Sequence, residues 1–201
     1  IHDGYTGYLR STEIGPVADA NFMVAQRTTH LYPAPDFRAR EIAALSFGSR
    51  LRIVSETDRF LETDAGAYVP KPHLRGLGKP FGDPVTVAQL FFGIPYLWGG
   101  TSGFGLDCSA LVQMALRAAG ESAPRDSDMQ EAQLGQEVTA DAPVERGDLY
   151  FWKGHVAIAV DGETLIHANA HHMAVAYEPI RAAIARIEAQ GDGPVTSRRR
   201  L

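Results

Sequence analysis

The sequence has little of what marks three large classes of protein. Its 201 residues include one cysteine, so no internal disulfide can form. No apolar run approaches the roughly 18 residues that are needed to cross a bilayer. The formal net charge is −5, whereas nucleic-acid-binding domains usually carry a basic surface. The remaining composition, 45% hydrophobic and 21% charged, is that of a globular chain with room for one or two domains.

Up to about residue 77 the sequence is typical of a small β domain. Short segments in which apolar and polar residues alternate are separated by residues that favour turns, such as glycine, aspartate and serine. The predicted strands are Phe22–Ala25, Arg50–Val54 and Phe60–Thr63. Leu74–Pro80 contains two glycines and a proline, and we expect it to link this part to the rest of the chain.

The cysteine lies at the start of a predicted helix. Residues 109–119 form a mainly apolar helix that ends at Gly120, and Cys108 directly precedes it. A thiol in this place meets the unpaired N–H groups and the positive dipole end of the helix, which favour the thiolate. A buried, unreactive cysteine is the structural alternative. The polar neighbours Asp107 and Ser109 and the glycines of the preceding loop favour a nucleophile at the mouth of a cleft.

Two histidines are predicted to share one face of a sheet. A three-residue loop at 161–163 would pair Ala157 with His167 and so place His155 and His167 on the same face, whereas a two-residue turn would separate them. Ala157 and Ala159 lie on that face as well, and we expect their small side chains to let the cysteine helix approach. A base that activates the thiol and a third group that orients the base would complete such a site. The strands involved are Gly147–Trp152, His155–Val160 and Thr164–Asn169.

The order of these segments resembles that of the NlpC/P60 family of bacterial cysteine peptidases. The resemblance covers roughly 82–201, and its motifs are Pro95–Gly100, Leu106–Val112, Gly147–Leu149, Gly154–Ile158 and Leu165–Ala168. It implies a papain-like α/β domain and a hydrolase that requires no cofactor. The residue roles that it implies are Cys108 as nucleophile, His155 as general base and His167 as the group that orients this base.

The first part of the chain resembles a bacterial SH3 domain through the rhythm of its strands. We therefore expect an α+β protein with an SH3-like β-barrel over 16–77 and an NlpC/P60 domain over 82–201. In the second domain the cysteine helix should pack on an antiparallel sheet. Residues 1–15 are interpreted either as the remnant of a preceding SH3-like domain or as an N-terminal strand.

The resemblance also implies a substrate class. Such enzymes usually cut peptidoglycan stem peptides between D-γ-glutamate and a diamino acid, in turnover or recycling of cell-wall peptides, and members with SH3-like domains tend to require a free N-terminal L-alanine. Asp107 resembles the carboxylate that holds the amine of this alanine, and Tyr96 the phenol beside the oxyanion. The other pocket residues implied are Ser109, Ser127 and Tyr5. The structural alternatives are helix capping for Asp107 and Ser127 and simple packing for Tyr96.

Other functions stay open at this point. The same residues would serve an amidase of other bond specificity, and the first domain alone would serve a non-catalytic module that binds the cell wall. A third alternative is zinc held by Cys108, His155 and His167 together with His171 or His172.

The sequence shows no secretory leader at its start, which is Ile1 rather than Met. We expect a bacterial cytoplasmic enzyme, with a periplasmic or secreted location as the alternative if a segment precedes Ile1. The expected partner is a peptide substrate derived from peptidoglycan, with no nucleic acid and no membrane span. The sequence does not identify the diamino acid or the oligomeric state.

Overall fold

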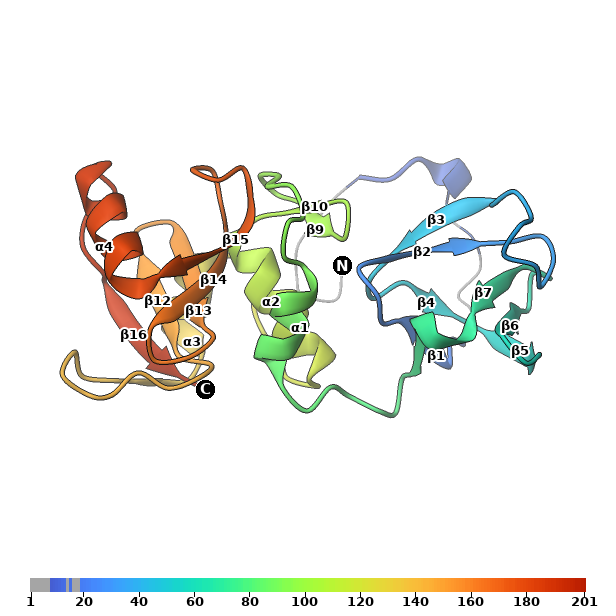
Figure 1. The fold of residues 1–201 in the computed structure, drawn as a ribbon, viewed down its shortest axis with the longest axis horizontal. Helices are drawn as coiled ribbons and strands as arrows, with labels where there is room; N and C mark the ends of the chain where they lie inside the picture. Colours follow the sequence, from blue (N-terminus) through green and yellow to red (C-terminus); the bar gives the residue numbers. More distant parts are fainter. Residues whose placement is uncertain (1–7, 14, 16–18) are drawn as a thin grey trace. The chain divides into compact units, whose positions relative to one another are not determined.

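The structure is a computed structural model that describes residues 8–13, 15 and 19–201. Contacts divide the chain into two compact units (Figure 1). The first ends at Pro80 and also includes Ser102–Phe104, and the second comprises Phe81–Thr101 and Gly105–Leu201. In the described ranges no helix is long and apolar enough to cross a membrane.

Short antiparallel strands make up the first unit. β4, β1 and β8 form one sheet, β2 and β3 a second, and β5, β6 and β7 a third. Phe47, Phe60 and Val69 are buried, whereas Phe37 is exposed. The ladders between the strands described here do not close into a barrel, so the SH3-like barrel stays a prediction. The elements are η1 (Ser11–Glu13), β1 (Phe22–Val24), β2 (Thr28–Leu31), β3 (Ala43–Ser46), β4 (Arg50–Leu51), β5 (Ile53–Glu56), β6 (Phe60–Thr63), β7 (Tyr68–Pro70), η2 (Lys71–His73) and β8 (Leu74–Gly76).

An antiparallel sheet forms the centre of the second unit, with the strand order β11-β16-β12-β13-β14-β15. Nearly every side chain of its central strands is buried, because helices cover both faces. The strands are β11 (Gln136–Glu137), β12 (Leu149–Trp152), β13 (His155–Ala159), β14 (Thr164–Asn169), β15 (Ala174–Pro179) and β16 (Ser197–Arg200), with the short β9 (Thr101–Ser102) and β10 (Gly105–Leu106) outside this sheet.

Helices α2 and α4 pack on opposite faces of the sheet (Figure 1). α2 contacts β13 and β14, and α4 contacts β14 and β15. Ala157 and Ala159 belong to the core under α4, where they pack with Ile180 and Ala183. The expectation that these alanines make room for the cysteine helix is therefore wrong, because that helix lies on the other face. The helices are α1 (Pro84–Leu90), α2 (Cys108–Ala118), α3 (Ser127–Gln133) and α4 (Ile180–Ala189).

The cysteine helix has the buried character that its sequence predicts. Leu111 and Leu116 are each 1% exposed. The polar Gln113 is also buried, and its side-chain amide donates to the carbonyl of Ala123 at 3.1 Å. Gly120 ends the helix with φ +90°, a left-handed conformation that glycine adopts without strain.

Strands β13 and β14 pair only near their connecting loop. The pairs are Ile158–Ile166 and Ala159–Leu165, which is the register predicted from a three-residue loop. Farther from the loop β13 stays paired with β12 up to His155, and β14 with β15 up to Asn169. In the described part of the chain no further pair joins β13 to β14, so the two strands separate at the end of the sheet that carries His155.

An ion pair and a close backbone approach hold the outer strands. Asp148 is fully buried and accepts hydrogen bonds from Nε of Arg200 at 2.8 Å and from Nη2 at 2.9 Å, which anchors β16 beside β12. Gly135 precedes β11 with φ +56°, and a Cβ there would lie 2.2 Å from the carbonyl oxygen of Arg200. The contact between β11 and β16 therefore requires glycine at this position.

We expect Gly135→Ala to lower the free energy of unfolding by about 1–3 kcal/mol, through a left-handed alanine and a clash with the adjacent strand. Gly162→Ala is the matched control, because its added Cβ would meet the Val144 carbonyl at an ordinary 3.8 Å. Urea titration followed by tryptophan fluorescence checks this, since both tryptophans, Trp98 and Trp152, lie in the second unit. Equal stability of the two variants would contradict the prediction.

Candidate active site

Cys108 is the first residue of α2, and Asp107 caps this helix. The carboxylate of Asp107 accepts from the backbone N–H of Ala110 at 2.9 Å, which satisfies one of the free donors of the first turn. The thiol itself is only 6% exposed. Its burial raises the pKa of Cys108, although the backbone N–H groups of Val156 and Ser109 act in the opposite direction. The helix start favours the thiolate as expected, but burial outweighs this effect, so the net pKa of Cys108 is raised and the resting thiol carries its proton.

His155 and His167 are joined by a hydrogen bond. Nε2 of His155 lies 2.9 Å from Nδ1 of His167, so one of these nitrogens donates to the other. His167 is fully buried, whereas His155 at the start of β13 keeps partial exposure. Burial lowers the pKa of His155 to about 3 and that of His167 to about 4. Both rings are therefore neutral near pH 7, the state in which one of them can accept a proton.

The thiol lies against the start of β13. The effect of the Val156 N–H on the pKa of Cys108 places the sulfur next to the first residues of β13, directly after His155. Among the described residues no hydrogen bond joins Sγ of Cys108 to the His155 ring. In free enzymes such catalytic contacts are often long and tighten when the substrate binds.

Tyr96 also lies close to the nucleophile. Burial raises its pKa to about 12, and the charges of Cys108 and Asp107 add to the rise. The phenol therefore keeps its proton at neutral pH. An O–H in this place can donate to negative charge that develops on a bound carbonyl.

The carboxylate of Asp107 also forms a buried ion pair that the sequence did not reveal. Nη1 and Nη2 of Arg125 donate to its two oxygens at 2.9 and 2.7 Å, and Nη1 also donates to Oγ of Ser109 at 2.9 Å. The N–H of Gly99 donates to Oδ2 at 2.9 Å. Asp107 is thus saturated with donors, and a substrate amine would have to compete with them. The one signal in the sequence is that Arg125 lies two residues before Ser127, a predicted pocket residue.

Ser127 and Tyr5 are the two other predicted pocket residues. Ser127 is the first residue of α3 and is half-buried. Tyr5 lies outside the described residues, so its assignment to the pocket stays a prediction.

A second ion pair, also missed from the sequence, lies behind His167. Oε2 of Glu178 is 3.1 Å from Nε2 of His167, and Arg186 of α4 donates to both carboxylate oxygens, from Nε at 2.9 Å and from Nη2 at 2.7 Å. The signal that points to Glu178 is the strand register, because it pairs with Leu165, two residues from His167 on the same face.

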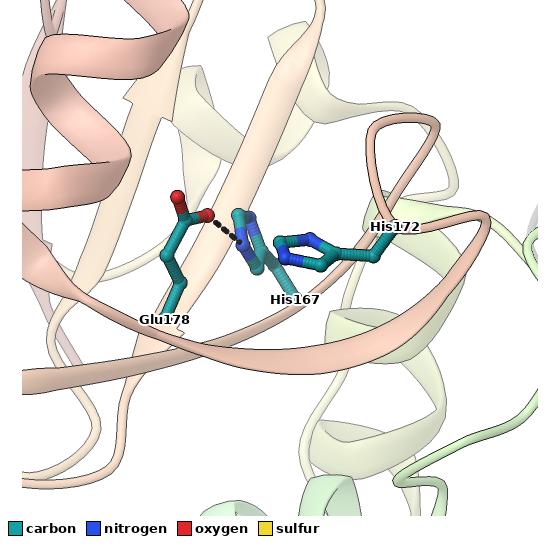
Figure 2. A group of neighbouring side chains, drawn as sticks. All are labelled: His167, His172 and Glu178. Atoms are coloured by element: carbon teal, nitrogen blue, oxygen red, sulfur yellow. Dashed lines mark hydrogen bonds and ion pairs between the residues drawn. The ribbon is translucent and has the colours of Figure 1, made fainter.

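His172 completes a group that could hold a metal ion. Figure 2 shows its ring beside His167 and Glu178, and one potential ligand atom from each of the three lies within 4.8 Å of the others. The zinc alternative drawn from the sequence used Cys108 and His155 instead of Glu178. An ion at the observed group would compete with Arg186 and with the His167 ring for the carboxylate of Glu178.

We expect the second unit to lose stability as the pH falls from about 6.5 to about 4. In this range the unfolded chain protonates His155 and His167 at their ordinary pKa of 6.5, whereas the folded protein holds both neutral. The unfolded state then binds more protons than the folded state, so the free energy of unfolding decreases as the pH is lowered. Urea titrations at several pH values test this, with His155→Gln flattening the slope and the exposed His171→Gln leaving it unchanged. Equal slopes in all three proteins would contradict the prediction.

Comparison with known proteins places this site in a family. The model of the NlpC/P60 family matches residues 93–188, which include Tyr96, Cys108, His155, His167 and Glu178. A gamma-D-glutamyl-L-lysine dipeptidyl-peptidase of Bacillus subtilis is 38% identical over 186 residues, which are 82% of this chain and 60% of that protein. A protein of the same name from Bacillus cereus is 34% identical over 211 residues, 89% of this chain and 60% of that one.

The fold agrees with this match. The crystal structure of an NlpC/P60 family protein from Bacillus cereus superposes with a TM-score of 0.72 at 27% identity, over 90% of this chain and 62% of that one. The chain spans about 60% of the length of the two curated relatives. It carries a domain of the NlpC/P60 family, with the papain-like mixed α/β fold.

Proposed function

We propose that this protein is a cysteine endopeptidase that cuts peptidoglycan stem peptides between D-γ-glutamate and a diamino acid. The observation that carries the proposal is a thiol at the start of a buried helix, together with a hydrogen-bonded pair of neutral histidines on the strands that this helix contacts, in a segment that matches the NlpC/P60 family. The bond specificity is supported by the names of the two Bacillus relatives, which are gamma-D-glutamyl-L-lysine dipeptidyl-peptidases.

The mechanism uses the groups in their resting charge states. His155, neutral at pH 7, takes the proton of the Cys108 thiol as the sulfur attacks the amide carbonyl, and His167 holds the ring of this base. The amine leaves with a proton from His155, and water then hydrolyses the thioester. The phenol of Tyr96 and backbone N–H groups at the start of α2 donate to the oxyanion. No step requires a cofactor.

The substrate contacts are part of the same proposal. Asp107 anchors the free N-terminal amine of L-alanine, in competition with its bonds to Arg125, and Ser109 and Ser127 line the pocket. Tyr5 is a further candidate. Residues 16–77 act as an SH3-like module, and residues 82–201 form the peptidase domain. We place the reaction in the turnover of released wall peptides in the bacterial cytoplasm.

Mass spectrometry of L-Ala-γ-D-Glu-L-Lys and its diaminopimelate counterpart, incubated with the protein, tests the proposal. We expect the wild type to release the dipeptide L-Ala-D-Glu and Cys108→Ala to release none, because the only cysteine supplies the nucleophile. Loss of the base in His155→Gln should slow release by about 10²- to 10⁴-fold. His171→Gln, a change of the same kind at an exposed histidine, should cleave like the wild type.

Three outcomes would contradict the proposal. Release of the dipeptide by Cys108→Ala would exclude Cys108 as the nucleophile. Cleavage by the wild type at a different amide bond would favour the amidase alternative. If neither peptide is cut and Cys108→Ala keeps the full biological effect of the wild type, the first unit would be a wall-binding module that works without catalysis.

A further inference from the structure

The buried pair of Glu178 and Arg186 has a role that follows from where hydrogens can lie. Glu178 is 8% exposed and sits on β15, and Arg186 reaches it from α4. The two hydrogen bonds from Arg186, at 2.9 and 2.7 Å, hold the carboxylate in a bidentate arrangement. The hydrogen bonds and the charge of Arg186 lower the pKa of Glu178 and outweigh the opposing effect of burial, so the carboxyl is ionised. An ionised carboxylate can only accept hydrogen bonds.

This restriction determines the tautomer of His167. A neutral imidazole carries a single N–H, on one of its two nitrogens. Nε2 of His167 lies 3.1 Å from an oxygen that can only accept, so the proton must be on Nε2 (Figure 2). Nδ1 of His167 then has a free electron pair. The nearby His172 does not change this assignment, because its Nδ1 is engaged with Asn169 at 2.9 Å.

The tautomer of His155 follows from that of His167. Nδ1 of His167 now accepts, so Nε2 of His155, 2.9 Å away, must be the donor. His155 therefore holds its proton on Nε2 and presents an unprotonated Nδ1. In this tautomer Nδ1 is the nitrogen that can take the thiol proton, whereas in the other tautomer it would already be protonated and could not act as the base.

We propose that Glu178, held by Arg186, is a positioning residue that sets the tautomers of both histidines and leaves Nδ1 of His155 as the base. The inference rests on the proposed peptidase function for its consequence in catalysis. The hydrogen positions themselves do not depend on which substrate is cut. Among the described residues the hydrogen bonds of Glu178 go to His167 and Arg186 and none goes to Cys108 or Asp107, so its removal should change the chemistry and not the binding of substrate.

Nitrogen NMR of the protein labelled with ¹⁵N-histidine tests the tautomers without any substrate. In the wild type at pH 7 we expect His155 to show a protonated Nε2 and an unprotonated Nδ1, and His167 the same. In Glu178→Gln the amide can donate as well as accept, so both histidines should populate the other tautomer. Glu188→Gln, an exposed Glu-to-Gln change on α4, should leave the spectrum unchanged.

Kinetics provide the second readout. We expect Glu178→Gln to lower kcat by roughly 10- to 1,000-fold with KM nearly unchanged, less than the ~10⁴-fold lost when the direct partner of a catalytic histidine is amidated. Arg186→Lys, which keeps a positive charge beside Glu178, should retain kcat within a few-fold. Arg186→Gln should lower kcat almost as much as Glu178→Gln does. Arg181→Gln, a change at an exposed residue of the same helix, should leave kcat unchanged.

A protonated Nδ1 on His155 in the wild type would overturn the inference, whatever the activity. So would a Glu178→Gln variant with wild-type tautomers and wild-type kcat. If the wild type cuts neither test peptide, the proposed function fails, and the NMR comparison still decides this inference. Thermal unfolding of each variant separates a loss of folded protein from a change in the histidines.

Discussion

The hydrogen bond between His155 and His167 is the interaction on which the rest of the site depends. It spans the place where β13 and β14 separate, so it joins two strands that no longer share a backbone ladder there. A fully paired sheet would leave no space between these strands for groups from the opposite face. Because the strands part, the start of α2 on one face can bring its thiol close to histidines that belong to the other.

Burial determines the charge of each group in the site. It raises the pKa of Cys108 and of Tyr96 and lowers the pKa of both histidines, so every one of these groups is neutral near pH 7. The helix start and the N–H of Val156 favour the thiolate, but they do not outweigh desolvation. The thiol of Cys108 is therefore protonated at rest and loses its proton during the attack. It does not form an ion pair with His155 in advance. Charge at rest is confined to two salt bridges, Asp107 with Arg125 and Glu178 with Arg186.

Local rules predicted much of the second unit from the sequence. The three-residue loop at 161–163 gave the register of β13 and β14, and Gly120 gave the end of α2, because both depend on neighbouring residues. The side of the sheet that α2 covers could not be predicted in this way. Ala157 and Ala159 are small enough to face either helix, and only the complete chain shows that they face α4.

The partners of the predicted residues were missed because they are distant in the sequence, although the register of β14 with β15 is a signal for Glu178. Arg125 is 18 residues from Asp107, and Glu178 is 11 residues from His167, with no motif to connect either pair. The family resemblance pointed to the residues at the reaction centre. The buried charges that hold them appear only when β15, α4 and the segment before α3 are packed in place.

The rate at which iodoacetamide alkylates Cys108, measured from pH 5 to pH 10, tests the central claim that the site is neutral at rest. The chain has one cysteine, so the mass of the intact protein reports this single reaction. We expect a rate that is low at pH 6–7 and still rises above pH 9. In the unfolded protein the rate should rise at lower pH, because a free thiol titrates at about pH 8.5. A rate that is already high and constant between pH 6 and pH 8 would show a preformed thiolate beside a protonated histidine and would contradict the account.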